Sequence, residues 1–228
     1  MTAAASKLAS GQSGSIDPFA VARWNLAPAH TALVVIDPQN DFLHDAGWYA
    51  QSGVDISHMQ RTIEPIRALV AAARLKRIPV IWTRHGFRDA RDAGVFFQLR
   101  PFLKDGGLRQ GTWGNAIMDG LGACPEDWYV EKTRLSAFYN TSLEGTLRAL
   151  RAETVLFAGV LTNQCVAATS KDASFRDFKP IVVEECTGTT LPHLHGPAIE
   201  MIRVGWGEVR GLEETLSEIA TLPMASAL

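Results

Sequence analysis

A carboxylate, an ammonium and a thiol each follow a strand that the sequence predicts. Asp37 comes directly after the apolar run TALVVI, Lys132 follows WYVE, and Cys165 lies a short turn beyond TVLFA. The carboxyl ends of the strands in an open parallel sheet lie along one edge, and such folds bind their ligands there. An acid–base group, a cation and a nucleophile brought together at that edge are suited to cleaving an amide.

Cys165 is the candidate nucleophile. It lies in GVLTNQCVAATS, where the sequence predicts that a helix begins. The positive end of a helix dipole lowers the pKa of a thiol, and free backbone N–H groups at a helix start can hold an oxyanion. The structural alternative is a buried cysteine that packs as a small hydrophobic side chain.

Asp37 and Lys132 also have structural alternatives. Asp37 precedes Pro38, and because Asp-Pro favours turns, its carboxylate could cap a turn rather than act as a base or bind a metal. A lysine at a strand end commonly extends its ammonium into solvent. Position alone leaves these roles open.

The strands that would position these residues are short apolar runs, most of them rich in β-branched residues. Continuous apolar runs of this kind indicate strands covered on both faces, as in a parallel sheet. The six runs are residues 31–36, 79–83, 128–131, 154–158, 180–183 and 207–210. Between these runs, five segments have apolar residues at helical spacing, at 57–77, 142–152, 162–178, 197–204 and 212–220. Alternating strands and helices predict a doubly wound α/β fold with right-handed crossovers.

Two long segments interrupt this alternation. They are residues 38–56 and 84–127, and both leave from predicted strand ends. Segments of this length in a compact domain commonly serve as lids or binding loops. We therefore expect both to cover the edge that carries Asp37, Lys132 and Cys165.

Composition narrows the class of protein. The chain has 228 residues, 46% hydrophobic and 20% charged, with a net charge of −2, which offers no basic surface for nucleic acid. No apolar run approaches the roughly 20 residues that a membrane span needs. Residues 1–28 are predicted to be a mobile tail and lead-in to one domain over residues 29–228. Three cysteines without a CxxC pair predict a reduced, cytoplasmic protein.

Three segments resemble the isochorismatase-like cysteine hydrolases. They are the first strand with DPQNDF, Lys132 followed by SAFYNT, and GVLTNQCV, and the resemblance runs from about residue 29 to 210. It implies a Rossmann-like three-layer α/β/α fold with a six-stranded parallel sheet and a triad of Asp37, Lys132 and Cys165. It also implies a cis peptide between Val160 and Leu161, an oxyanion hole formed by the N–H groups of Leu161 and Cys165, and a homotetramer.

The segment after the second strand argues against a metal site. Nicotinamidases of this superfamily have an Asp-x-His metal motif there, whereas this chain reads TRHGFRDARD with the single histidine His85. One histidine among scattered acids rarely completes a set of metal ligands. We therefore predict no metal and no other cofactor, and we interpret His85 as a lid or wall residue.

Within the superfamily, GTWGN, KTRLSAFYNTSLEG and DPQNDFL most resemble the branch that cleaves ureides. We predict a small linear ureide as substrate, with biuret or triuret ahead of ureidoacrylate. The alternatives are an N-carbamoyl amino acid, nicotinamide, and a non-enzymatic role as a binding protein. The side chains predicted to contact the substrate are Gln39, Asn40, Phe42, Trp113, Phe138, Asn140 and Gln164. Arg134, with Arg84, Arg88 and Arg91, is a candidate to bind a substrate carboxylate, although a solvated surface position is the alternative for each arginine.

Overall fold

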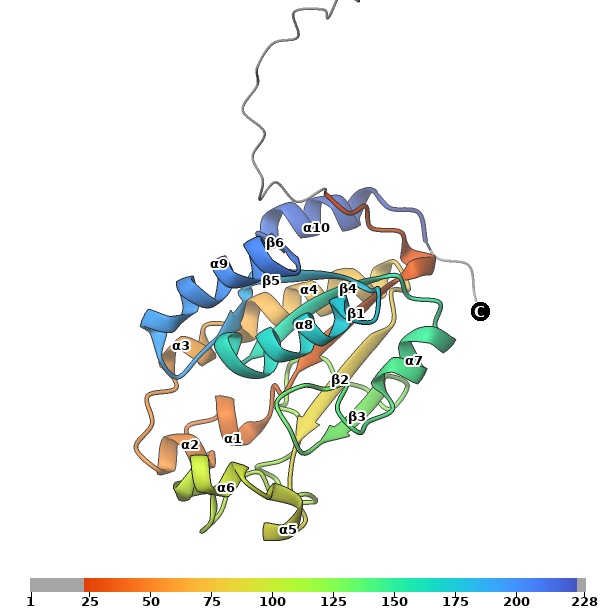
Figure 1. Ribbon diagram of the computed structural model, residues 1–228. Helices are drawn as coiled ribbons and strands as arrows, with labels where there is room; N and C mark the ends of the chain where they lie inside the picture. Colours follow the sequence, from red (N-terminus) through yellow and green to blue (C-terminus); the bar gives the residue numbers. More distant parts are fainter. Residues whose placement is uncertain (1–22, 225–228) are drawn as a thin grey trace, which may run out of the picture.

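The computed structural model describes residues 23–224, which form a three-layer α/β/α fold around a parallel sheet (Figure 1). The six strands lie in the order β3-β2-β1-β4-β5-β6, and every neighbouring pair is parallel. They are β1 (Thr31–Ile36), β2 (Val80–His85), β3 (Trp128–Lys132), β4 (Thr154–Val160), β5 (Lys179–Gly188) and β6 (Glu208–Arg210). The predicted fold class is therefore confirmed.

The central strands are buried on both faces, because their side chains alternate between two hydrophobic cores. On β1, Leu33 and Val35 pack into the core beneath α4 (Ile63–Leu75) and α10 (Leu212–Thr221). Val34 and Ile36 point the other way, into the core beneath α7 (Leu143–Ala149), α8 (Ala167–Ser174) and α9 (His195–Gly205).

Two predicted helices are divided in the structure. The first, expected over residues 57–77, forms α3 (Ser57–Gln60) and then α4, with a break before Ile63. A continuous helix would have Pro65 in its interior, whereas the break leaves it in the first turn of α4, where proline is tolerated. The helix expected over 162–178 begins as a π-helical turn, η3 (Thr162–Val166), and continues as α8.

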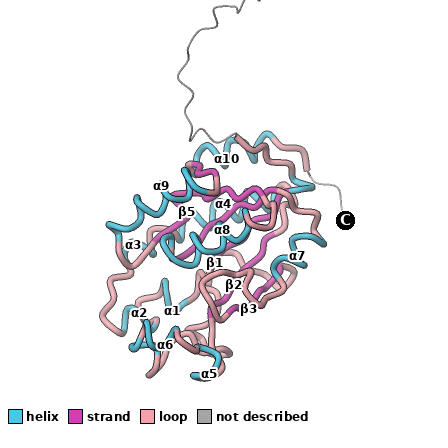
Figure 2. Tube along the Cα trace, viewed as in Figure 1, coloured by secondary structure: helices cyan, strands magenta, loops and turns pink. Residues whose placement is uncertain are grey.

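The two long segments gather at the carboxyl ends of the strands, as expected. The first contains α1 (Asn40–Leu43) and α2 (Trp48–Gln51), and the second contains α5 (Ala90–Ala93), α6 (Phe96–Leu99) and the 3₁₀ turn η2 (Pro101–Leu103). Figure 1 shows α1, α2, α5 and α6 together at the end of the molecule toward which β2 and β3 point. Most of the remaining length of these segments is loop (Figure 2).

The short turns η1 (Pro28–His30) and η4 (Pro192–Leu194) precede β1 and α9. Residues 1–22 of the predicted tail lie outside the described residues. From residue 23 the lead-in packs against the C-terminal helix, where Leu26 is buried and its N–H donates to Glu218 at 3.0 Å. Trp24 adds a hydrogen bond from its N–H to Glu208 at 2.9 Å. Within residues 23–224, no helix is long and apolar enough to cross a membrane.

Candidate active site

Asp37, Lys132 and Cys165 come together at the carboxyl edge of the sheet, as the strand ends predict. The Lys132 Nζ atom lies 2.7 Å from Asp37 Oδ2 and 3.4 Å from Cys165 Sγ. All three residues are at most 3% exposed. An ion pair this deeply buried requires further hydrogen bonds, and Nζ also donates to the carbonyls of Arg134 (3.0 Å) and Leu135 (3.1 Å).

Asp37 is positioned by the strand beside it. Its backbone takes a left-handed conformation (φ 49°), which aspartate tolerates better than most residues and which turns the chain out of β1. The hydroxyl of Thr83, on β2, donates to Asp37 Oδ1 at 2.5 Å and accepts the Asp37 N–H at 3.1 Å. Sequence reasoning missed Thr83, because only the packing of β1 beside β2 brings the two residues together.

Cys165 lies in the π-helical turn η3, which hydrogen bonds hold from two sides. Thr162 Oγ1 contacts His195 Nδ1 at 3.0 Å, and Asn163 Oδ1 accepts the Thr189 hydroxyl at 2.7 Å. The peptide between Val160 and Leu161 is cis, which confirms that expectation.

The charge state of Cys165 corrects the sequence expectation. Burial raises the pKa of the thiol to about 12, although the nearby Lys132 charge acts to lower it. Burial also lowers the pKa of the Lys132 ammonium, but its interactions with Asp37 and Cys165 outweigh burial and raise it overall. The helix dipole was expected to favour a thiolate, but Cys165 lies in η3, ahead of α8, where desolvation of the sulfur dominates. The raised pKa favours the protonated thiol in the resting site.

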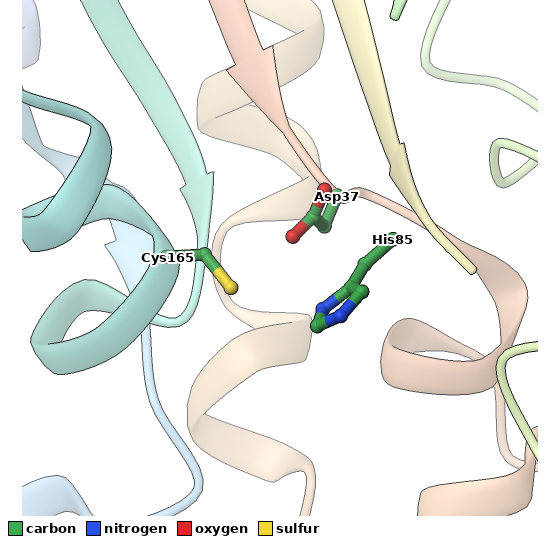
Figure 3. Close-up of side chains that lie close together, drawn as sticks. All are labelled: Asp37, His85 and Cys165. Carbon is green, nitrogen blue, oxygen red and sulfur yellow. The ribbon is translucent and has the colours of Figure 1, made fainter. Parts of the chain in front are cut away.

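His85 is the fourth polar residue of this group. A ring nitrogen of His85, the Cys165 sulfur and an Asp37 carboxylate oxygen all lie within 4.8 Å of one another, and Figure 3 shows the three side chains converging. The ring is 1% exposed and packs against Phe87 and Phe96, with centroid distances of 5.0 and 5.1 Å. The interpretation of His85 as a lid or wall residue therefore understated how close it lies to the thiol.

Asp37, His85 and Cys165 are ligand types that a transition metal accepts, but the ammonium of Lys132 already fills the cationic position among them. A metal ion bound to Asp37 and Cys165 would lie about 2.0–2.3 Å from their ligand atoms. It would then be next to Nζ, and two cations would share a site with little solvent to screen them. The ammonium thus fits this donor set better than a metal does.

Several of the side chains predicted to contact the substrate have partners within the protein. The Gln39 amide donates to the carbonyls of His85 and Asn115, both at 3.0 Å, and its oxygen accepts the His85 N–H at 2.7 Å, so it is committed to the backbone. Asn40 donates to the Trp113 carbonyl at 2.8 Å. Phe138 stacks on Phe178, with ring centroids 6.0 Å apart.

The other predicted contacts vary in their access to a ligand. Phe42 is buried and packs on Tyr49 at 4.7 Å, and Gln164 is half-buried beside Cys165. Trp113 is 52% exposed, and Asn140 is an exposed turn residue with φ 52°.

The four candidate arginines also have partners. Arg134 donates to the carbonyl of Asp92 at 2.7 Å, which ties the segment carrying α5 to the chain after β3. Arg84, Arg88 and Arg91 pair with Glu131, Asp92 and Asp89.

Tyr49 is a further residue that sequence reasoning missed. Burial raises the pKa of its hydroxyl, and Cys165 is among the groups that raise it further. Its ring packs between Phe42 and Phe102. No strand end or motif marks Tyr49 in the sequence.

Comparison with known proteins agrees with this geometry. The isochorismatase domain family matches residues 31–214. The chain belongs to the isochorismatase family. Among its relatives is the ureidoacrylate amidohydrolase RutB of Methylobacterium radiotolerans, 33% identical over 221 residues, which are 89% of this chain and 86% of the relative. RutB of Agrobacterium fabrum is 34% identical over 176 residues, 71% of this chain and 77% of the relative.

Solved structures of the isochorismatase family share the fold. A cysteine hydrolase from Pseudomonas syringae pv. phaseolicola superposes with a TM-score of 0.80 at 26% identity, covering 87% of this chain and 96% of that one. An isochorismatase family protein from Desulfovibrio vulgaris gives a TM-score of 0.73 at 28% identity, covering 83% and 98%. Together, the relatives and the buried cysteine site identify this isochorismatase-family member as an amidohydrolase.

Proposed function

We propose that this protein is a cysteine-dependent amidohydrolase that cleaves a C–N bond of a small ureide, with ureidoacrylate as the first candidate. The observation that carries the proposal is the Lys132 ammonium, which contacts both Asp37 and Cys165 in a buried site. That contact joins a carboxylate able to move a proton, a nucleophile and a stabilising charge.

In the proposed reaction, the Cys165 thiol passes its proton to Asp37 as the sulfur attacks the substrate carbonyl carbon. The Lys132 ammonium stabilises the negative charge that develops, and the N–H groups of Leu161 and Cys165 hold the oxyanion. Asp37 returns the proton to the leaving nitrogen, and ammonia or a small amine departs. Water then hydrolyses the thioester and restores the thiol. The raised thiol pKa fits a mechanism in which the proton leaves only when substrate is bound.

The relatives favour ureidoacrylate over the biuret or triuret that the sequence put first. Ureidoacrylate carries a carboxylate, and Arg100 is the arginine best placed to bind it. Arg100 is half-buried between α6 and η2, and its guanidinium donates to the Leu99 carbonyl at 2.9 Å. Among the described residues, no carboxylate pairs with it. Arg100 and Cys165 both influence the pKa of the buried Tyr49, which supports Arg100 as part of the same site.

A comparison of kcat/KM across small amides tests the substrate. The panel is ureidoacrylate, biuret, triuret, N-carbamoylsarcosine and nicotinamide, assayed by ammonia release. We expect ureidoacrylate to be the best of the five, and Arg100→Ala to lower its kcat/KM while changing that for neutral biuret little. A clear preference for nicotinamide or N-carbamoylsarcosine would refute the ureide assignment.

The nucleophile is tested by Cys165→Ala, with Cys124→Ala as the matched control. Groups that act as one catalytic unit lose several orders of magnitude in rate when one is removed. We expect such a loss for Cys165→Ala with an unchanged melting temperature, and normal activity for Cys124→Ala. Dialysis against EDTA should leave the wild-type rate unchanged, because the ammonium fills the cationic position. Activity in Cys165→Ala would show that Cys165 is not the nucleophile. If a contaminating hydrolase accounts for that activity, the alternative role as a binding protein remains.

We also propose a cytoplasmic homo-oligomer, a tetramer, whose other partner is its small-molecule substrate. The free thiols of Cys124, Cys165 and Cys186 support a reducing compartment. Exposed apolar side chains on α8 and α9 support assembly.

A further inference from the structure

His85 contains a polar atom that the fold leaves unpaired. Its Nε2 is buried and has no hydrogen-bond partner. Within residues 23–224, the only other buried side-chain nitrogen or oxygen in this state is Asp37 Oδ2, which is compensated by the ion pair with Lys132. A buried nitrogen without a partner costs roughly 1–3 kcal/mol. Figure 3 shows the ring beside Cys165 and Asp37, so a substrate bound at the thiol would be close enough to supply a partner.

Three hydrogen bonds hold the backbone of His85 in place. Its N–H donates to Gln39 at 2.7 Å, and its carbonyl accepts hydrogen bonds from Gln39 and Asn115, both at 3.0 Å. The rings of Phe87 and Phe96 pack against the imidazole in edge-on and tilted contacts. The imidazole is therefore held in place before any substrate arrives.

The ring is neutral. Burial lowers the pKa of His85 far below its ordinary value, and the charge of Lys132 lowers it further. A neutral imidazole has one N–H and one bare nitrogen, so it can accept a hydrogen bond at working pH. With so low a pKa it is a poor base and does not compete with Asp37 for the thiol proton.

We infer that His85 recognises the substrate as a ureide, by accepting a hydrogen bond from the internal N–H that a plain amide lacks. This inference rests on the function proposed above and names the residue that selects the substrate class. A carbonyl carbon about to be attacked lies about 3–3.5 Å from the sulfur. A nitrogen bonded to that carbon could then lie about 2.9 Å from the imidazole nitrogen. A separation of at most 4.8 Å between ring nitrogen and sulfur has room for this arrangement.

The test compares two substrates that differ at one group. They are ureidoacrylate and the monoamide of glutaconic acid, in which CH₂ replaces the internal N–H and the carboxylate is retained. For His85→Phe, which keeps an aromatic ring at this position but has no ring nitrogen, we expect kcat/KM on ureidoacrylate to fall about 10- to 100-fold. The value for the monoamide should stay within about threefold, because that substrate makes no such bond. His85→Gln restores an acceptor and should recover part of the ureide preference.

Three results would overturn the inference. One is an equal fall for both substrates, which would indicate a structural or general catalytic role. Another is an unchanged ureide-to-amide ratio in His85→Phe. The third is a pH profile of kcat/KM that loses its acid limb in His85→Gln, which would make His85 a proton carrier. If the wild-type enzyme hydrolyses neither substrate nor any other amide of the panel, the proposed function itself fails. Melting temperatures of both variants check that the fold is intact.

Discussion

Asp37 depends on a neighbour outside the group of Asp37, Lys132 and Cys165. Of its two carboxylate oxygens, Oδ2 pairs with Lys132, while Oδ1 accepts the Thr83 hydroxyl. Thr83 therefore orients the carboxylate, and Lys132 compensates its negative charge. A buried carboxylate that is proposed to accept and return a proton must not rotate between the two steps, so Thr83 is a positioning residue.

Thr83→Val should therefore lower activity without unfolding the protein, because valine matches threonine in shape. A hydrogen bond to a charged group contributes about 1.5–3 kcal/mol. We expect kcat/KM to fall about 10- to 100-fold, mainly through kcat. Thr83→Ser keeps the hydroxyl and should retain most of the activity. Equal losses in the two variants would show that packing at β2, rather than the hydrogen bond, matters.

The sequence predicted Asp37, Lys132 and Cys165 because strand ends can be recognised one strand at a time. It did not predict Thr83 or Tyr49, whose contacts arise between segments far apart in the chain. His85 and Lys132, which pair across β2 and β3, are likewise far apart in the chain. The predicted direction of the Cys165 pKa shift was wrong for a related reason. Burial depends on everything packed over a residue, whereas a helix dipole depends on local sequence alone.

At the scale of elements, strands and helices were predicted in the right order, but several of their ends were not. β2 continues to His85 and β5 to Gly188, beyond the apolar runs that marked them. Polar residues extend a strand when a neighbouring strand supplies hydrogen bonds, as β3 does for Arg84 and His85. The small helices of the two long segments lack a repeated apolar pattern, so periodicity could not find them.

Arg134, which the sequence offers as a candidate to bind a substrate carboxylate, also links two of these elements. Its guanidinium donates to the Asp92 carbonyl, at the base of the segment that carries α6 and the proposed Arg100. Arg134→Ala should release that segment, raising KM about tenfold with a smaller effect on kcat, since a charge-assisted hydrogen bond is lost and the nucleophile is untouched. Limited proteolysis should cut residues 88–104 faster in this variant.

Arg88→Ala is the matched control for Arg134→Ala. Arg88 contacts the same Asp92, but its side chain is 75% exposed and the contact is a surface ion pair, which contributes little. We expect near-normal KM and proteolysis for Arg88→Ala. If both variants behave alike, the tether from Arg134 to α5 is not what holds the segment in place.

At the scale of the whole molecule, large apolar side chains are exposed at the C-terminal end of α8 and on α9. Phe175 at the end of α8 is 69% exposed, and Met201 on α9 is 59% exposed. Beside them lies a groove of about 240 Å³. Its lining residues are Asn163, Ala167, Leu194, Pro197, Ala198, Met201 and Trp206. By contrast, Phe96 and Phe97 of α6 are buried and pack into the core.

If this surface forms the proposed oligomer, Met201→Glu should dissociate it, because burying an unpaired carboxylate costs several kcal/mol. Light scattering at micromolar concentration should give roughly four times the 24.8 kDa chain mass for the wild type, and a smaller species for Met201→Glu. Leu75→Glu, at an even more exposed apolar position on α4, should leave the mass unchanged. Because Asn163 and Ala167 of the groove flank Cys165 in sequence, dissociation should also lower kcat/KM. A monomeric wild type would refute the tetramer, and dissociation by Leu75→Glu alone would place the interface on the opposite face of the sheet.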